Sequence, residues 1–95
     1  MSVYLVAQLR FTDRAAYDRY QAAFWGVFSK FNGKILAADE HPVTVEGHWD
    51  REKIVILEFP DANSADAFSA SPEYELISRD RKAGADAVVL RVQGF

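Results

Sequence analysis

Four ionisable side chains fall in regions whose residue types indicate β-strands, where a folded sheet could bring them together. Glu46 and His48 lie in one such region, Glu58 in the next, and Arg91 in the last strand of the chain. Two carboxylates enclosed near each other raise the pKa of one of them, as acid–base chemistry near neutral pH requires. Histidine is the side chain whose ordinary charge change falls in the same range, which makes His48 a candidate. We therefore predict Glu46, His48 and Glu58 as the candidate catalytic residues.

A second group of side chains has the polar or aromatic character needed to bind a ligand: Tyr4, Gln8, Trp49, Arg81 and Arg91. Arg81 shares a helical face with Ile77 and Ser78, so its planar guanidinium could bind a ligand carboxylate. Trp49 could stack on a flat ligand. The competing interpretation of Arg81 is that its stem packs while its head group extends into water.

Each candidate also has a purely structural interpretation. Glu58 and Arg91 could form an ion pair, with Glu46 and His48 on a solvated edge, because ion-pair networks also perturb pKa values. Trp49 could pack at a subunit boundary, where aromatic side chains are enriched. For any single one of Glu46, His48, Glu58, Arg91 and Trp49 we favour the structural interpretation, whereas for Arg81 we weigh the two interpretations equally. As a group, these residues are the best candidates for a site.

Several classes of site are excluded by composition. The chain has no cysteine, which rules out disulfides, thiolate catalysis and cysteine-ligated zinc. The two histidines, His41 and His48, have no supporting carboxylate at metal-ligand spacing, so we predict no metal site. No Gly-x-Ser-x-Gly motif and no glycine-rich phosphate loop occurs. We expect no cofactor.

Charge and hydropathy limit the classes of partner that the chain is expected to bind. Eleven basic residues stand against 14 acidic ones, giving a formal net charge of −3, and no basic run occurs. Nucleic acid binding needs a basic surface, so we expect no nucleic acid partner. The N-terminal apolar run is too short for a membrane span and has no basic residues before it. We expect a cytoplasmic protein that does not bind membranes.

The pattern of apolar residues predicts one α+β domain over residues 1–95, of the ferredoxin-like class with an antiparallel sheet. In the first helix, five aromatic residues form one stripe: Tyr17, Tyr20, Phe24, Phe28 and Phe31. Thr12 is its expected cap, and Asn32-Gly33 its expected end. The predicted helices span 13–31, 65–70 and 72–83, and the strands span 3–9, 34–39, 43–49, 54–59 and 86–92. The pieces 34–39 and 43–49 belong to one strand region that Pro42 interrupts, so the order is β-α-β-β-α-β.

Strand side chains alternate between faces, which divides the predicted sheet into two surfaces. We expect the helices to cover an apolar face made of Val3, Leu5, Ala7, Leu9, Val43, Val45, Gly47, Val55, Leu57, Phe59, Val88, Leu90 and Val92. The opposite face mixes aliphatic and polar side chains: Tyr4, Val6, Gln8, Thr44, Glu46, His48, Ile54, Ile56, Glu58, Ala87, Val89 and Arg91. This second face is too apolar to be left in water. We therefore expect a homodimer in which the second face encloses a small organic ligand.

Three short motifs resemble a bacterial domain-of-unknown-function family, number 1330: Glu46-Gly47-x-Trp49, Glu58-Phe59-Pro60 and Ser71-Pro72-Glu73-Tyr74. The resemblance runs over nearly the whole chain. It implies the dimeric α+β barrel class, in which two ferredoxin-like sheets face each other. The chain departs from the family's usual glycine-rich turn at residues 38–42, so the rim of a pocket there is expected to differ.

The resemblance implies a fold and an assembly but no reaction, because the activity of that family is unassigned. The wider class includes cofactor-independent monooxygenases, haem-handling enzymes, small lactone isomerases and ligand sensors, and a shared fold does not choose between them. Our first hypothesis is a cofactor-independent enzyme that performs proton transfer or oxygenation on a small organic molecule. The alternative is a non-catalytic ligand-binding module or a structural dimerisation module.

Overall fold

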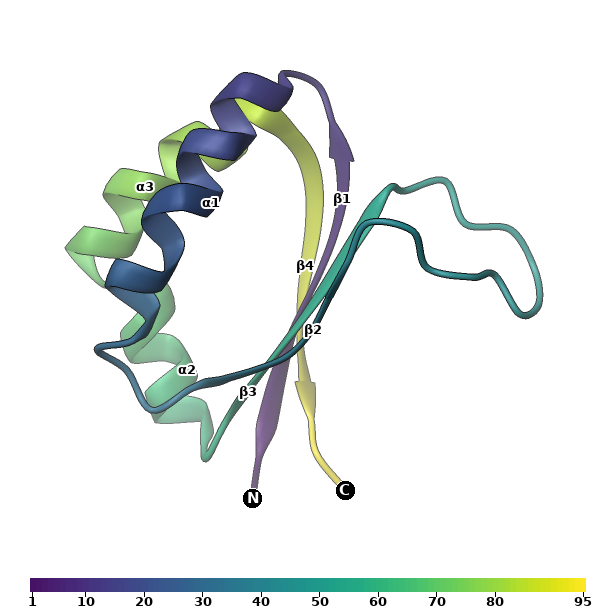
Figure 1. Cartoon of the computed structure of the whole chain (residues 1–95). Coiled ribbons are helices and arrows are strands. Elements are labelled where there is room, and N and C mark those ends of the chain that lie inside the picture. Colours follow the sequence, from purple (N-terminus) through teal and green to yellow (C-terminus); the bar gives the residue numbers. More distant parts are fainter.

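A computed structural model describes all residues, 1–95, and has the predicted βαββαβ order, with the predicted short helix before the last long one. The elements are β1 (Val3–Phe11), α1 (Arg14–Phe28), β2 (Lys34–Asp39), β3 (Lys53–Phe59), α2 (Ala62–Ser69), α3 (Pro72–Gly84) and β4 (Ala85–Gln93). The four strands form one antiparallel sheet in the order β2-β3-β1-β4. All three helices lie on one side of this sheet, and its other side has no covering layer (Figure 1). The predicted ferredoxin-like α+β fold is therefore confirmed.

Side-chain caps begin each helix. Asp13 accepts a hydrogen bond from the backbone N–H of Ala16, and Asp61 accepts one from the N–H of Ser64. Ser71 caps α3 in the same way, with Pro72 in the first turn, where a missing N–H costs nothing. Asp13 rather than Thr12 is thus the cap of α1, and the helix begins one residue later than predicted.

The core is aromatic and lies between the helices and the sheet. Phe28, Phe59 and Phe68 are almost completely buried, one each from α1, β3 and α2. The stripe predicted on the first helix faces this core, although α1 itself ends at Phe28. Because large rings bury much apolar area, this cluster is the main source of stability for a chain of this length.

Residues 43–49 do not form the predicted strand. They belong to the connection between β2 and β3, which extends away from the sheet on the side opposite the helices (Figure 1). Val43 and Val45 are 85% and 95% exposed, and Gly47 has a positive φ of 88°. The sequence here alternates as a strand does, but β2 already pairs with β3 along that edge. The segment itself pairs with no strand of the sheet, and a strand without a ladder is not stable.

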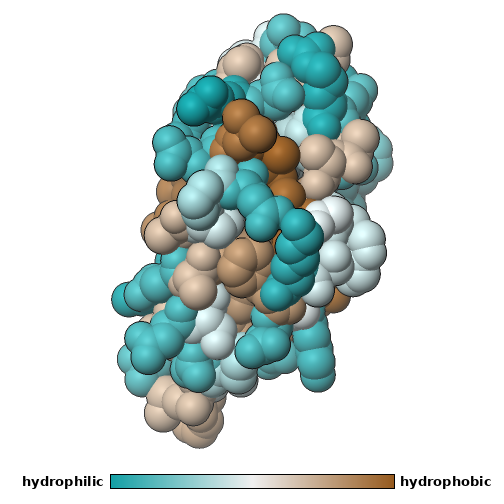
Figure 2. Space-filling model, turned by 90° about the vertical axis from the view of Figure 1, so that its left-hand side faces the viewer, coloured by the Kyte–Doolittle hydropathy of each residue, from teal (hydrophilic) through white to brown (hydrophobic).

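The faces of β1 and β3 are as predicted, but those of β4 are reversed. Cross-strand neighbours in an antiparallel pair point to the same face. Leu5 pairs with Arg91, and Ala7 pairs with Val89, so both β4 side chains lie on the helix side. The exposed face instead receives Val88, Leu90 and Val92, which are 40–47% exposed. Seen from the side of the helices, by contrast, the surface is largely hydrophilic, with apolar atoms between polar side chains (Figure 2).

Gly84 lies where the end of α3 meets the start of α1. Its carbonyl oxygen accepts hydrogen bonds from the N–H groups of Thr12 and Asp13. A Cβ at this position would lie 2.7 Å from the carbonyl oxygen of Asp13 and would overlap the backbone nitrogen of Tyr17. Only a residue without a side chain allows the two helices to approach this closely.

Replacing Gly84 by alanine is therefore expected to lower the free energy of unfolding by about 1–3 kcal/mol, the usual cost of overpacking. Gly26→Ala is the matched control, because a Cβ there meets nothing within 4 Å. It is expected to raise stability by about 0.5–1 kcal/mol, since alanine is the better helix former. Urea denaturation followed by circular dichroism measures both. Equal effects would contradict the close contact between α1 and α3.

Candidate functional site

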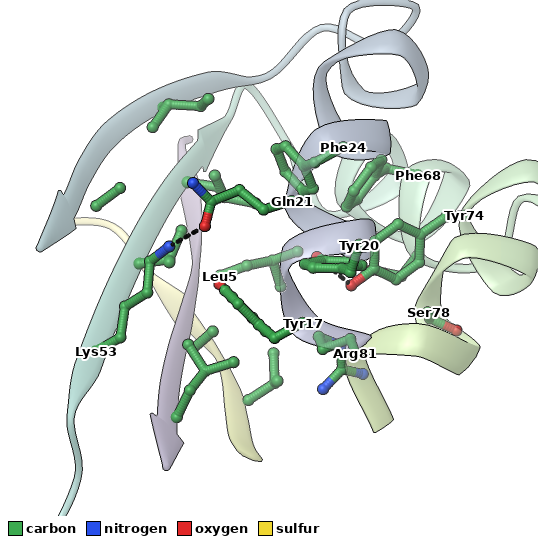
Figure 3. A pocket seen from close by; sticks show the side chains of 18 of the residues that line it. Leu5, Tyr17, Tyr20, Gln21, Phe24, Lys53, Phe68, Tyr74, Ser78 and Arg81 are labelled. Atoms are coloured by element: carbon green, nitrogen blue, oxygen red, sulfur yellow. Dashed lines mark hydrogen bonds between the residues drawn. The ribbon is translucent and has the colours of Figure 1, made fainter. Parts of the chain in front are cut away.

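A cavity lies between the helices and the sheet of a single chain, not on the uncovered face of the sheet. Its volume is about 520 Å³, within the range of pockets that hold small organic ligands. Most of its lining is apolar or aromatic (Figure 3). The residues that supply polar or ionisable groups to it are Tyr17, Tyr20, Gln21, Lys53, Ser69, Tyr74, Glu75, Ser78, Arg81 and Lys82.

Lys53 places a buried amine in the wall. It is the first residue of β3 and points to the helix side, with its side chain only 6% exposed. Nζ donates a hydrogen bond of 3.0 Å to Oε1 of Gln21 and lies 3.7 Å from Oε2 of Glu40. It also lies 4.9 Å from the centre of the Tyr17 ring, a cation–π distance. Burial lowers the pKa of Lys53, and the charge of Glu40 opposes this shift.

Glu40 is itself held by Arg14, at the start of α1. Both carboxylate oxygens of Glu40 accept hydrogen bonds of 2.9 Å from the guanidinium, the bidentate arrangement typical of arginine. These bonds keep the pKa of Glu40 below its usual value. The carboxylate therefore remains charged near neutral pH and is a fixed negative partner for Lys53.

Three tyrosines form the aromatic wall beside α3. The hydroxyl groups of Tyr20 and Tyr74 lie 3.0 Å apart and share a hydrogen bond. Burial raises the pKa of Tyr17 to about 12 and raises that of Tyr20 further, while the charge of Arg81 opposes both shifts. Near neutral pH these hydroxyl groups are therefore uncharged hydrogen-bond donors or acceptors.

Arg81 brings a second cation to the cavity. Its Nε is buried and has no hydrogen-bond partner, and Figure 3 shows its guanidinium near Tyr17. A buried donor without a partner is costly, and such groups in folded proteins call for a specific explanation. An anionic oxygen of a bound molecule would supply the missing acceptor. The cavity thus combines a mainly apolar lining with a cationic group, which suits the binding of an organic acid.

The residues predicted from sequence do not converge. Arg81 is in the wall of the cavity, whereas Tyr4, Gln8 and Glu58 lie on the uncovered face of the sheet. Tyr4 and Glu58 are cross-strand neighbours, and hydrogen bonding to Glu58 raises the pKa of the Tyr4 hydroxyl. Trp49 reaches back from the connection after β2 and donates a hydrogen bond of 2.9 Å from Nε1 to Oε1 of Gln8.

Glu46 and His48 are exposed in that same connection. No hydrogen bond or ion pair joins either residue to Glu58 or to any other predicted site residue. Arg91 was expected beside Glu58 but lies on the helix side, where it forms an ion pair of 2.6 Å with Asp66 of α2. The predicted pairing of Glu58 with Arg91 is therefore wrong. The reason is the reversed facing of β4.

Sequence reasoning missed most of the cavity, including Lys53, Gln21 and the polar role of the tyrosines. One signal was present: Lys53 occupies the same strand phase as Val55, Leu57 and Phe59, which are inward-facing positions. A lysine in an otherwise apolar inward phase is rarely buried without a partner. That pattern could have pointed to the helix side of the sheet.

The structure has neither a cluster of metal-ligating side chains nor a membrane-spanning helix. No group of three or more histidine, aspartate or glutamate residues lies close enough together to hold a metal ion. None of the three helices has the length and apolar character required to cross a membrane.

Comparison with known proteins gives one family and several structures of similar fold. The family model described as "Domain of unknown function (DUF1330)" matches residues 2–95. No curated protein matches the sequence of this chain. A crystal structure of RPA0582, a protein of unknown function from Rhodopseudomonas palustris, has a TM-score of 0.82 at 18% sequence identity. That match covers 99% of this chain and 82% of the other.

Two further structures show the same fold at lower identity. SnoaB, a cofactor-independent oxygenase from Streptomyces nogalater, has a TM-score of 0.71 at 14% identity, covering 99% of this chain and 93% of the other. A dimeric ferredoxin-like protein of unknown function from Thermobifida fusca has a TM-score of 0.71 at 13% identity, covering 99% and 92%. At these identities the likeness is one of fold.

Proposed function

This chain belongs to the DUF1330 family of domains of unknown function, and we propose that it binds an apolar organic acid in the cavity between its helices and its sheet. The observation that carries this proposal is the buried Nε of Arg81, which has no partner within the chain and belongs to a residue that lines that cavity. A carboxylate, phenolate or enolate oxygen would complete its hydrogen bonding. The aromatic lining would hold the apolar body of the same ligand.

The reaction we propose is proton transfer without a cofactor. A site that stabilises an organic anion also favours its formation from the neutral acid, because the charge develops where a cation already lies. Similarity in fold to a cofactor-independent oxygenase supports this choice but does not extend to its substrate. Lys53, a buried amine with a lowered pKa, is the group in the wall best suited to accept a proton.

A non-catalytic binding role is the second candidate. Both histidines lie outside the cavity, and its only carboxylate, Glu75, belongs to an exposed residue. Most general acid–base sites use a histidine or a carboxylate. This composition favours a protein that holds its ligand without converting it.

We also propose that two copies of the chain pair through the uncovered face of the sheet. That face carries a continuous set of aliphatic side chains: Val6, Ile54, Ile56, Val88, Leu90 and Val92. An apolar surface of this kind on a small domain is typical of an interface. A protein of similar fold from Thermobifida fusca is described as dimeric, which supports this arrangement.

Calorimetric titration with naphthoate, a flat aromatic acid, tests the ligand proposal. We expect one binding site per chain, and we expect Arg81→Gln to weaken binding about tenfold, the effect of losing about 1.4 kcal/mol of charge-assisted hydrogen bonding. Naphthyl methanol, the uncharged analogue, should bind the native chain and Arg81→Gln equally, because it does not need the cation.

Arg79→Gln is the matched control variant, since Arg79 is an exposed arginine of the same helix and does not line the cavity. It should bind naphthoate as the native chain does. The proposal is wrong if neither naphthoate nor the smaller acid benzoate binds the native chain, or if both arginine variants weaken binding equally.

A further inference from the structure

Lys53 is unusual for a lysine in a small α+β domain because its side chain is buried in the wall of a mainly apolar cavity. The chain has four lysines, and the other three, Lys30, Lys34 and Lys82, are exposed. Only Lys53 combines a side-chain exposure as low as 6% with a position in the cavity lining. In Figure 3 its amine points along the wall toward Gln21.

The neighbours of the amine fix its position without enclosing it. Gln21 of α1 accepts one hydrogen bond at 3.0 Å, and Glu40 lies at ion-pair distance. The Tyr17 ring covers another side at 4.9 Å. The other charged groups that act on it are Arg14 and Asp18 of α1, which pair with each other and, in the case of Arg14, with Glu40. An ammonium has three N–H donors, and only one is engaged at hydrogen-bond distance.

From this geometry we infer that the Lys53 amine condenses with the carbonyl group of an aldehyde or ketone bound in the cavity, forming an imine. The inference rests on the proposed function in one respect: the cavity must admit a small organic molecule. The nitrogen forms a bond to the carbonyl carbon, and the carbonyl oxygen leaves as water after taking two protons from the nitrogen. The net change converts an ammonium and a carbonyl compound into a protonated imine and water.

The charge of the site does not change in this reaction. A protonated imine carries the same positive charge as the ammonium it replaces, at nearly the same position. Glu40 and the face of the Tyr17 ring, which stabilise the ammonium, would therefore stabilise the product as well. The carboxylate partner is thus compatible with imine formation and does not trap the amine in its original state.

Two properties of the cavity favour the reaction at Lys53 over the exposed lysines. Burial lowers the pKa of this amine, and each unit of lowering raises the neutral, nucleophilic fraction at neutral pH about tenfold. The lining is mainly apolar and aromatic, so it would concentrate a carbonyl compound with an apolar body and would retain little of the water that reverses the reaction.

Reductive trapping with naphthaldehyde and cyanoborohydride tests the inference, because the hydride reduces an imine to a stable secondary amine. Peptide mapping by mass spectrometry of the full chain should place the adduct on Lys53 at a rate severalfold above that of any exposed lysine. Lys34→Arg is the matched control, since Lys34 is exposed on β2 and does not line the cavity. It should leave the labelling unchanged, whereas Lys53→Arg should abolish the fast phase.

Mapping on the native chain keeps the test independent of whether Lys53→Arg folds. Naphthoate should also protect Lys53, since it would occupy the same cavity. If naphthoate binds but the label spreads over the exposed lysines, the inference about Lys53 is wrong and the proposed function stands. If naphthoate fails to bind and Lys53 is still labelled rapidly, the amine is reactive and the acid-binding proposal is wrong. If naphthoate does not bind and Lys53 is not labelled rapidly, the acid-binding proposal and the inference about Lys53 are both wrong.

Discussion

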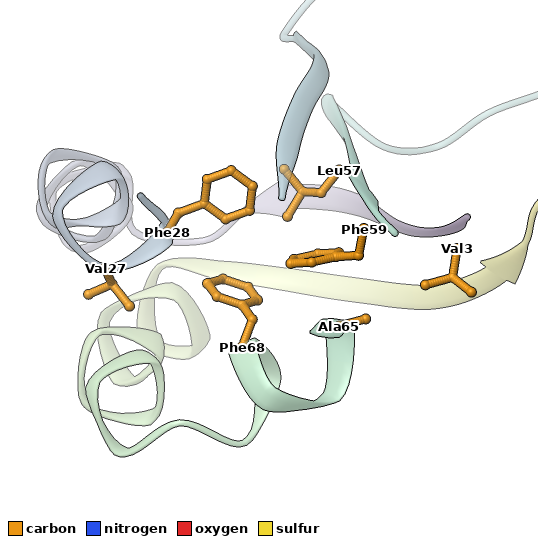
Figure 4. Close-up of a cluster of buried hydrophobic side chains, with 7 residues drawn as sticks. All are labelled: Val3, Val27, Phe28, Leu57, Phe59, Ala65 and Phe68. Carbon is orange, nitrogen blue, oxygen red and sulfur yellow. The ribbon is translucent and has the colours of Figure 1, made fainter. Parts of the chain in front are cut away.

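Replacing Phe68 by alanine is expected to lower the free energy of unfolding by about 3–5 kcal/mol, the range for removing a buried aromatic side chain. Phe68 is 2% exposed and lies at the centre of the core, where α2, α1 and the sheet meet (Figure 4). Its ring centroid lies within 6.0 Å of five others, those of Phe24, Phe28, Phe31, Phe59 and Tyr74. Because these rings come from three different elements and one loop, the surroundings cannot collapse easily into the space left behind.

Urea denaturation with a fitted slope measures this loss, and Phe95→Ala is the matched control. Phe95 is fully exposed at the end of the chain, so its removal should change stability by less than about 0.5 kcal/mol. A loss below about 1.5 kcal/mol for Phe68→Ala would show that this ring is not the centre of the core. Since a typical domain is stable by only about 5–15 kcal/mol, the expected loss leaves little margin for folding.

Phe68 also lines the ligand cavity, which connects stability to the proposed function. The same helix-side surface of the sheet supplies the core at one end and the cavity at the other. Val55 and Leu57 contact the buried clusters and also face the cavity. The cavity and the core thus share residues of the same sheet surface.

The aromatic stripe of the first helix could be predicted because its cause is local. Side chains at steps of three and four residues must share a helical face, and a run of rings on that face must be buried. The end of this helix was less predictable. Gly33 was expected to adopt a left-handed conformation after the helix, but its φ is not positive. Its role is steric, since a Cβ there would clash with the rings of Phe28 and Phe59.

The facing of β4 could not be predicted because both phases of this strand are apolar. Val88, Leu90 and Val92 alternate with Ala87 and Val89, so hydrophobicity alone does not say which set points inward. The pairing register with β1 decides, and that register is a property of the folded sheet. The helix side takes Ala87, Val89 and Arg91, whose guanidinium pairs with Asp66 of α2, and the uncovered face takes Val88, Leu90 and Val92.

This reversal changes which charged groups lie on the uncovered face. With Arg91 assigned to the uncovered face, that face appeared to have a cation opposite Glu58. With Arg91 on the helix side, the uncovered face becomes more apolar and loses its anion-binding group. The change weakens the argument for a ligand between two sheets. It strengthens the argument that the uncovered face is an interface, because a more apolar surface needs a cover.

Leu90→Glu is therefore expected to weaken self-association at least about 30-fold, the effect of a hot-spot loss of about 2 kcal/mol or more. Leu90 pairs with Val6, which pairs in turn with Ile56, so its side chain belongs to a row across the middle of the uncovered face. A carboxylate buried at the centre of a two-fold interface would meet its own copy or apolar side chains, without a cation to pair with. Sedimentation velocity over a concentration series measures the change.

The position of Leu90 makes the test specific to association. Its side chain is 47% exposed in the single chain, on the edge strand β4, so a charge there costs the isolated fold little. Leu76→Glu is the matched control: Leu76 is 62% exposed on α3, on the opposite side of the molecule from the uncovered sheet face. It should leave both self-association and the thermal transition unchanged. A native chain that sediments as a monomer at every concentration, or equal losses in both variants, would mean that two copies do not pair through this face.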